Sequence, residues 1–422
     1  MNWKKEPLGK ICKTTSGGTP SRKNQSYYQN GTIPWVKSGE LENNIITTSE
    51  EFITEEGLLN SSAKIFPAGT LLIALYGATI GKLAFLGIDA ATNQAVCGIF
   101  QNENVSLKYL YYYLLFQRPN LIKQGVGGAQ PNISQTILKK LEISYPDSIT
   151  EQQRIVARIE ELFSELDKAV DTLKTTKEQL VVYRQAILQQ AFIGNSNYHK
   201  RKSSIPKTEF KPVDAKELVQ LASLPQEWKY VYLSDLGNLS RGKSSHRPRN
   251  DPKLFENGVY PFFQTGDVKG AQKDLYNCEK KYNDVGLAQS KLWPAGTLCI
   301  TIAANIAETC FLGVDGCFPD SIVGFIPNDN LVLKEYIRFF IEASKLKLWA
   351  YAPATAQKNI NLSTLENLIV PYCGIEEQQY IVQKIEEIDS VCNKLEQTID
   401  IALAQADAMR QSILKQAFEG KI

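Results

Sequence analysis

The chain lacks the patterns that mark several large classes of protein. Its longest apolar stretch, residues 68–87, is interrupted by glycines and by Lys82, so it is too short and too polar to span a bilayer. The opening MNWKKEPLGK has no apolar core of the kind found in secretory signals. The eight cysteines form no CxxC pair and no spacing typical of zinc ligands. We therefore expect free thiols in a reducing cytoplasm and no contact with a membrane.

Motifs for catalysis are also missing. The chain has only two histidines, His199 and His246, which argues against a histidine acid–base pair. It has no GxGxxG cofactor loop, no GxxxxGK(S/T) phosphate loop and no (N/D)PP(Y/F) segment of the kind that amino-methyltransferases use to hold a flipped adenine. The Pro-Asp pairs at 146–147 and 319–320 are not followed within thirty residues by the (D/E)xK that would complete a nuclease metal site. We expect a non-catalytic chain with no metal site and no cofactor of its own.

What the chain does contain is an internal repeat with an offset of 226 residues, from Arg184 to Arg410. EQQRIVARIEE…RQAILQQAFIG (151–194) returns as EQQYIVQKIEE…RQSILKQAFEG (377–420), and KIFPAGTLLI (64–73) returns as KLWPAGTLCI (291–300). Two similar halves form a covalent pseudo-dimer, which suits a partner with two-fold character of its own.

The repeated segment that ends each half has the pattern of a long helix. Its apolar positions step by four and three residues, and a period of about 3.5 residues specifies a left-handed coiled coil. Thr150 and Gln153 fit a capping box at the start of the first copy. The economical partner is the other copy in the same chain, and a homodimeric zipper is the alternative. The expected seams run through Ile155, Ile159, Leu162, Leu166, Ala169, Leu173, Thr176, Leu180, Tyr183 and Ile187, and through Ile381, Ile385, Ile388, Cys392, Leu395, Ile399, Ala402, Ala406, Met409 and Ile413.

Short β-rich runs that alternate with Gly, Pro and Asn turns precede each long helix. We predict an α+β fold with two similar globular domains, separated by two long helices that form an intramolecular antiparallel coiled coil with pseudo-two-fold symmetry. The tyrosines of a helix near residues 107–123 either pack that helix on the sheet or on a partner, or stack on bases. The predicted boundaries are 1–150 for domain 1, 151–194 for the first helix, 195–226 for a linker, 227–375 for domain 2 and 376–422 for the second helix.

Charge is unevenly distributed along the chain. The net charge is +2, but the two helical segments sum to about −1 and −4, which leaves about +7 for the remainder. Basic clusters occur near the N-terminus, at residues 4–13, and in residues 241–253. Such clusters are compatible with a solvated surface and with contact to nucleic acid.

The two halves differ mainly in polar loops. SGGTPSRKNQSYY (16–28) corresponds to SRGKSSHRPRNDP (240–252), YGATIGK (76–82) to AANIAET (303–309), and NQAV (93–96) to DSIV (320–323). One scaffold with two loop sets suits the reading of two different short targets, although drift of surface loops after duplication produces the same pattern.

The loop residues have the chemistry needed to contact DNA. Arg and Lys donate to guanine, Asn and Gln pair with adenine, and glycine lets a backbone amide approach a phosphate. The recurring amides of GGAQPNIS (127–134) and ATAQKNIN (354–361) fit backbone positioning or a structural turn. The candidate DNA-binding residues are Ser16, Gly17, Gly18, Thr19, Arg22, Lys23, Lys37, Ser38, Tyr76, Thr79, Lys82, Asn93, Gln94, Gln130, Asn132, Arg241, Lys243, Ser244, Ser245, His246, Arg247, Arg249, Gln264, Thr265, Asn305, Gln357, Lys358 and Asn359.

Taken together, these motifs resemble a known family. PAGTLLI, a GGxQxNI turn, P…EQQxIVxxIE and RQxILxQAFxG, each occurring twice, closely resemble the specificity subunit of type I restriction-modification systems. The resemblance covers almost the whole chain, and the paired EQQ and QAF blocks at one offset are far more specific than any single motif.

The resemblance implies a function for each part of the chain. In that family each globular block is a target recognition domain that reads one half of a split DNA site, and the two helices pack antiparallel as a spacer. It implies double-stranded DNA, two methyltransferase subunits and restriction/translocase subunits as partners, with S-adenosylmethionine, Mg and ATP held only by those partners. The contacting residues transfer only as loop regions.

Two other hypotheses remain open at this point. A structural adaptor with a coiled coil would show no sequence-selective affinity for DNA that depends on salt. A self-sufficient methyltransferase or nuclease would need the missing motifs. Replacing Arg247 and Arg249 by Ala should weaken or relax only one half-site if the chain reads DNA.

Overall fold

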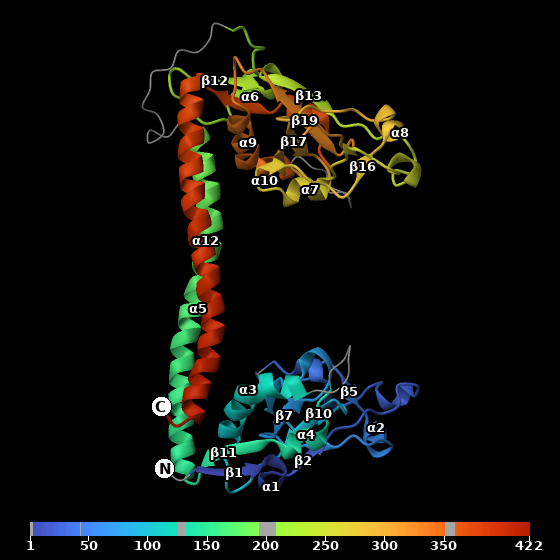
Figure 1. Ribbon diagram of the computed structural model, residues 1–422, viewed down its shortest axis with the longest axis vertical. Helices are drawn as coiled ribbons and strands as arrows, with labels where there is room; N and C mark the ends of the chain where they lie inside the picture. The colour runs from blue at the N-terminus through green and yellow to red at the C-terminus, as the bar shows by residue number, and fades with distance from the viewer. Residues whose placement is uncertain (1–2, 43, 125–131, 194–207, 351–358) are drawn as a thin grey trace. The chain divides into compact units, whose positions relative to one another are not determined.

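The computed structural model describes residues 3–42, 44–124, 132–193, 208–350 and 359–422. The candidate residues Gln130, Gln357 and Lys358 lie outside these ranges. The chain divides into two compact units, Met1–Lys174 with Asp400–Ile422 (unit 1) and Thr175–Ile399 (unit 2), and each contains one globular domain and parts of both long helices (Figure 1).

The main sheet of domain 1 has five strands in the order β2-β10-β7-β8-β4, antiparallel except for the parallel pair β8–β4. Its central strands β7 and β10 come from the apolar runs LLIA and VCGI, and all their residues are buried. A second sheet has the order β5-β3-β9-β6, and β1 pairs with β11. The elements are β1 (Trp3–Pro7), α1 (Leu8–Ile11), β2 (Thr14–Ser16), η1 (Gln25–Tyr27), β3 (Ile33–Val36), η2 (Ser38–Glu40), β4 (Asn44–Ile46), β5 (Phe52–Ile53), α2 (Glu55–Leu59), β6 (Ile65–Phe66), β7 (Leu71–Ala74), η3 (Gly77–Thr79), β8 (Leu83–Leu86), β9 (Ala90–Thr92), β10 (Val96–Ile99), α3 (Leu107–Gln124), α4 (Gln135–Lys140) and β11 (Glu142–Pro146).

Domain 2 repeats this topology. Its five-stranded sheet has the order β13-β19-β17-β18-β15, again with one parallel pair at the β15 edge, and β12 pairs with β20 as β1 does with β11. In both domains the PAGT turn before the central strand needs a positive φ, of 85° at Gly69 and 86° at Gly296, which only glycine adopts readily. The elements are α6 (Ala215–Leu218), β12 (Lys229–Tyr232), η5 (Leu233–Asp235), β13 (Gly237–Arg241), η6 (Pro252–Leu254), β14 (Tyr260–Pro261), α7 (Thr265–Gly270), β15 (Asp274–Leu275), β16 (Lys281–Tyr282), α8 (Asp284–Ala288), β17 (Leu298–Thr301), β18 (Thr309–Leu312), β19 (Ile322–Pro327), α9 (Lys334–Ala343), α10 (Lys345–Ala350), α11 (Leu362–Glu366) and β20 (Ile369–Tyr372).

Two helices of 44 residues, α5 (Ile149–Phe192) and α12 (Ile375–Phe418), run antiparallel within each unit (Figure 1). In unit 1 Arg410 pairs with Asp167, and Arg154 reaches the carbonyl of Ile422. In unit 2 the same direction follows from the ion pairs of Arg184 with Asp389 and of Lys177 with Glu396. The α+β prediction of two similar domains and an intramolecular antiparallel helix pair is therefore confirmed.

The predicted seam of the helix pair needs a correction. Ala169, Thr176 and Tyr183 are exposed, whereas the residues that follow them, Val170, Lys177 and Arg184, are half-buried. In α12 the predicted seam residues Leu395 and Met409 are likewise exposed, and the residues that follow them, Glu396 and Arg410, are half-buried. The step from Leu166 to Val170 is a second consecutive step of four, so the strict heptad is interrupted by a stutter, which locally unwinds the supercoil.

The start of α5 also differs from the prediction. The helix begins at Ile149, and Ser148 Oγ accepts a hydrogen bond from the amide of Glu151 (3.4 Å), so Ser148 rather than Thr150 is the capping residue. At its C-terminal end α12 stops at Phe418, and Gly420 just beyond it has a φ of 71°, a conformation typical of a glycine that follows a helix.

The QAF motif packs the end of each helix into the domain of the other half. Phe418, the last residue of α12, makes edge-on contacts with Tyr109 and Tyr113 of α3 in unit 1. Phe192, at the equivalent end of α5, packs in the same way on Tyr336 and Phe340 of α9 in unit 2. The alternative in which the α3 tyrosines serve packing is therefore correct for Tyr109 and Tyr113, which are buried and contact Phe418 of α12.

The central glutamine of the EQQ motif joins each long helix to its domain. The buried Gln152 donates to the carbonyls of Asn104 and Pro146 and accepts from the amide of Ser106. Gln378 makes the same three contacts in unit 2, with Leu331, Cys373 and Leu333. The motif thus satisfies backbone groups that the turn before each helix would otherwise leave buried and unpaired.

None of the described helices is both long and apolar enough to cross a membrane.

Candidate nucleic-acid interface

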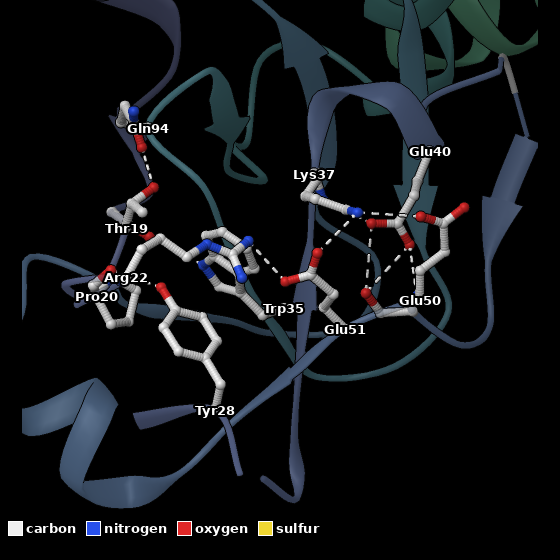
Figure 2. A network of polar contacts seen from close by, with 12 residues as sticks. Thr19, Pro20, Arg22, Tyr28, Trp35, Lys37, Glu40, Glu50, Glu51 and Gln94 are labelled. Carbon is white, nitrogen blue, oxygen red and sulfur yellow. Dashed lines mark hydrogen bonds and ion pairs between the residues drawn. The ribbon is translucent and has the colours of Figure 1, made fainter. Parts of the chain in front are cut away.

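In domain 1 the divergent loops follow β2, β7 and β9, and a hydrogen bond between side chains joins the loops after β2 and β9 (Figure 2). Thr19, in the loop 16–28, donates to the side-chain oxygen of Gln94, in the loop after β9. In domain 2 the corresponding loops are joined by Arg249, whose Nη2 lies 2.8 Å and 3.0 Å from the two carboxylate oxygens of Asp320. The two domains therefore hold the same pair of loops together with different chemistry.

The loop 16–28 is closed by two buried or half-buried rings. The indole N–H of Trp35 donates to the carbonyl of Gly18 (2.9 Å), and the hydroxyl of Tyr28 donates to the carbonyl of Pro20 (2.5 Å). The rings of Tyr28 and Trp35 meet edge to face, with centroids 6.0 Å apart. Trp35 comes from the centre of β3, so the shape of the loop is fixed by the sheet beneath it.

The amides of the loop glycines form hydrogen bonds within their own domain. The amide of Gly17 donates to the carbonyl of Val96, that of Gly18 to Thr92, and that of Gly242 to Ile322, so these N–H groups are already engaged within their own domain. A Cβ at Gly17 would come within 2.3 Å of Thr92, and a Cβ at Gly18 would come within 2.3 Å of Ala63. These glycines allow close packing of loop on sheet and are not available to bind phosphate.

Arg22 lies against both rings of this loop. Its guanidinium carbon is 4.4 Å from the centroid of Tyr28 and 4.9 Å from that of Trp35, and its Nη2 pairs with Glu51 at 2.7 Å (Figure 2). Its side chain is still 53% exposed. It is therefore held in place and open to solvent at the same time.

Lys37 shares Glu51 with Arg22. Its Nζ lies 3.0 Å from Glu51 and 3.1 Å from Glu50, and these contacts raise the pKa of the lysine. Burial would raise the pKa of the Glu51 carboxyl, but the pairing with Lys37 and Arg22 outweighs burial and the pKa is lowered. Glu51 is thus held in its charged form between two cations.

In domain 2 the loop 240–252 is held from within. Ser244 is buried beside the hydroxyl of Tyr282, and its carbonyl accepts from Arg247 Nη1 (2.7 Å). The ring of His246 lies 2.9 Å from Asp251, and its contact contributes, after the amide of Lys253, to lowering the pKa of that carboxyl. Ser244 is therefore inaccessible to DNA, and Arg247 serves to shape the loop.

The third divergent loop lies beside the recurring amide turn in each domain. Tyr76 forms a backbone bridge with Asn132, and Ala303 forms the equivalent bridge with Asn359. This favours the structural-turn interpretation of Asn132 and Asn359. Within the loops, the hydroxyl of Thr79 donates to the carbonyl of Tyr76, and the side chain of Asn93 accepts from the amide of Ala95. The amide of Asn305 donates to the carbonyl of Ala303, and its own carbonyl accepts from the hydroxyl of Thr301.

The other candidates lie at the edges of these loops. Ser16 accepts from Gln135 at the end of β2, Lys82 is 4.0 Å from Glu42, Ser38 begins η2, and Gln264 and Thr265 begin α7. Of these remaining candidates, Lys23, Arg241, Lys243, Ser245 and Gln264 are exposed.

Several residues of this surface were not among the candidates. Tyr28, Trp35, Glu51 and Asp320 position the arginines and close the loops, but an acid or a buried ring carries no sequence signal for nucleic-acid contact. Their partners are far away in the chain, so only the fold reveals them. Among the residues that the structure describes, no cluster of His, Cys, Asp or Glu could hold a metal ion.

A family model matches both halves of the chain. The type I restriction modification DNA specificity domain matches residues 1–180 and again residues 225–405.

Curated proteins match as well. The chain is 29% identical to the MjaIX specificity subunit of Methanocaldococcus jannaschii over 412 residues, which cover 92% of this chain and 86% of that protein. It is 32% identical to the EcoR124I/EcoR124II specificity subunit of Escherichia coli over 161 residues, 37% of this chain and 39% of that protein.

Solved structures share the fold. A chain from a study of complex assembly and conformational transition of the type I R-M system has a TM-score of 0.73 at 18% identity, covering 100% of this chain and 98% of that one. The HsdS subunit from Thermoanaerobacter tengcongensis has a TM-score of 0.58 at 19% identity, covering 100% and 97%.

Proposed function

From its membership of the family of type I restriction modification DNA specificity domains, we propose that each domain of this chain reads one half of an asymmetric bipartite site. The chain is a specificity subunit that recognises DNA sequence. Domain 1 and domain 2 contact the two half-sites, and the long helices set the distance between them. The chain itself performs no catalysis.

One observation carries this proposal. The two domains share the strand order of their five-stranded sheet and an equivalent backbone bridge, Tyr76–Asn132 and Ala303–Asn359. The loops at the same places nevertheless differ in sequence and in the contacts that hold them. A common scaffold with Thr19–Gln94 in one copy and Arg249–Asp320 in the other presents different donors and acceptors to base edges. Two different loop sets require two different half-sites.

The exposed faces of the long helices support a role in assembly. Both helices carry large apolar side chains that are at least 49% exposed, which is costly unless another protein covers them. We assign this surface to two methyltransferase subunits, with restriction/translocase subunits joining the full complex. These partners would hold S-adenosylmethionine, Mg and ATP. The exposed apolar residues are Val181, Val182, Val391, Leu395, Ile401 and Met409.

The test is a comparison of modified adenine in cells. Cells that express this chain with its methyltransferase subunits are compared, by single-molecule sequencing, with cells that lack the chain. We expect a split, asymmetric motif to be methylated only when the chain is present. Equal methylation without the chain, or none despite a stable complex, would replace the DNA reader by a structural adaptor.

A further inference from the structure

We propose that Arg22 is the residue of domain 1 that reads a guanine in its half-site, and that Glu51 positions it. This inference rests on the proposed function, because it names a base contact within the site that domain 1 is proposed to read. It assigns a specific role to a carboxylate that has no sequence signal of its own.

The guanidinium of Arg22 is pre-organised. It lies against the rings of Tyr28 and Trp35, at 4.4 Å and 4.9 Å, and pairs through Nη2 with Glu51. Within the described part of the chain, its Nε and Nη1 make no hydrogen bond. A planar arginine with donors left over and its rotamers restricted matches the two acceptors, O6 and N7, that guanine presents in the major groove.

Glu51 is itself fixed by the backbone around it. The carbonyl of Glu51 accepts from the amide of Trp35 (2.9 Å), which ties the segment before β5 to β3. One residue earlier, the amide of Glu50 donates to the carboxylate of Glu40, which also accepts from the amide of Lys37 (Figure 2). Because the backbone at Glu51 is fixed, its carboxylate stays in one position. The ion pair with this carboxylate therefore holds the Arg22 side chain in place.

The charge of this cluster favours a base over a phosphate. Arg22 and Lys37 are surrounded by the three carboxylates of Glu40, Glu50 and Glu51, so the group as a whole is acidic. A phosphate would be repelled by such a group, whereas a base edge is neutral and offers both acceptors and donors. An exposed carboxylate such as Glu50 can even accept from the amino group of cytosine.

Domain 2 offers a natural comparison. Arg249 lies in the corresponding loop, 240–252, but the acid that pairs with it is Asp320 from the loop before β19. The ring that corresponds to Tyr28, Phe255, is covered by Lys280 instead of by an arginine. The two arginines thus pair with acids from different segments of their domains, before β5 for Glu51 and before β19 for Asp320. A change at one should leave the half-site of the other intact.

The test compares Arg22→Lys, Arg22→Gln and Glu51→Gln with the wild-type chain, each as the full chain with its methyltransferase subunits, by sequencing the methylated motifs of the host DNA. Arg22→Lys keeps the positive charge but loses the planar fork, so it separates base reading from a phosphate contact. We expect both Arg22 variants to lose preference for guanine at one position of one half-site by about ten- to hundredfold. Glu51→Gln should relax the same position by a smaller factor.

Arg249→Gln is the matched control and should leave the position changed by Arg22→Lys untouched. Retention of the full motif by Arg22→Lys, or a uniform loss at all positions, would overturn the inference and indicate a phosphate contact. An unchanged Glu51→Gln motif would remove the positioning role of Glu51. If the wild-type chain itself directs no split motif, the proposed function fails instead, so the two failures are distinguishable.

Discussion

At the scale of single residues, the repeated motifs are explained by burial of polar groups. Gln152 and Gln378 are fully buried amides that each satisfy three backbone groups, while their neighbours Gln153 and Gln379 are exposed. The arginines of the repeat, Arg184 and Arg410, pair with acids of the other long helix. Similarity between the halves therefore marks positions where an unpaired donor or acceptor would be costly.

We predict that Gln152→Leu destabilises the chain by about 2–4 kcal/mol, because it leaves two carbonyls and one amide buried without partners. Gln153→Leu, at the next position of the same motif, should change stability by less than about 0.5 kcal/mol. Chemical denaturation of both variants measures the difference. Equal effects of the two substitutions would mean that the buried network is not what the motif provides.

A second prediction concerns pH. Burial raises the pKa of Glu342 above its usual 4.5, although Arg338 and the hydroxyl of Thr309 favour its charged form. An acid whose pKa is raised in the folded state stabilises the fold below about 4.5 and loses that contribution as pH rises through the folded pKa. Relative to wild type, Glu342→Gln should therefore become more stable as pH increases above 4.5.

Thermal unfolding between about pH 4 and pH 8 tests this. Glu376→Gln, at an exposed position of the same unit, controls for the loss of one charge. A stability difference between Glu342→Gln and wild type that stays constant over this range would contradict the prediction.

At the scale of elements, the long helices pack with each other and with both domains through their ends. The apolar period of about 3.5 residues predicts a coiled coil, but the residues on the seam shift by one after Leu166. Polar residues such as Lys177 and Arg184 take seam positions because they pair with acids on α12. Charge pairing between helices overrides the apolar pattern there.

The shifted seam can be tested with adjacent residues. Val170→Asp should destabilise unit 1 by about 1–3 kcal/mol, because it places a charge on the half-buried face of α5. Ala169→Asp, on the exposed face, should have an effect below about 0.5 kcal/mol. The strict heptad predicts the opposite order, so thermal melting of the two variants decides between the registers.

At the scale of the whole molecule, the duplication gives one chain two similar domains with different loops. If the helices set the distance between them, inserting four residues after Thr175 and four after Ile401, the equivalent positions of the two copies, lengthens both helices by about one turn. We expect the tolerated gap of the DNA site to grow by about one or two base pairs at about 3.4 Å each. Sequencing of the methylated motif measures the gap, and a change in half-site sequence instead of gap length would contradict the spacer role.

The sequence by itself determined the duplication, the α+β class, the helix pair and the family, because each depends on local patterns that repeat along the chain. It also located the divergent loops, since turns are marked by Gly, Pro and Asn. Only the tertiary structure decided which loop residues are exposed and which make contacts within the domain. The amides of Gly17 and Gly242 form hydrogen bonds within their domains, Ser244 is buried, and Arg22 pairs with Glu51. These outcomes depend on residues that meet only after folding, so no pattern along the chain could reveal them.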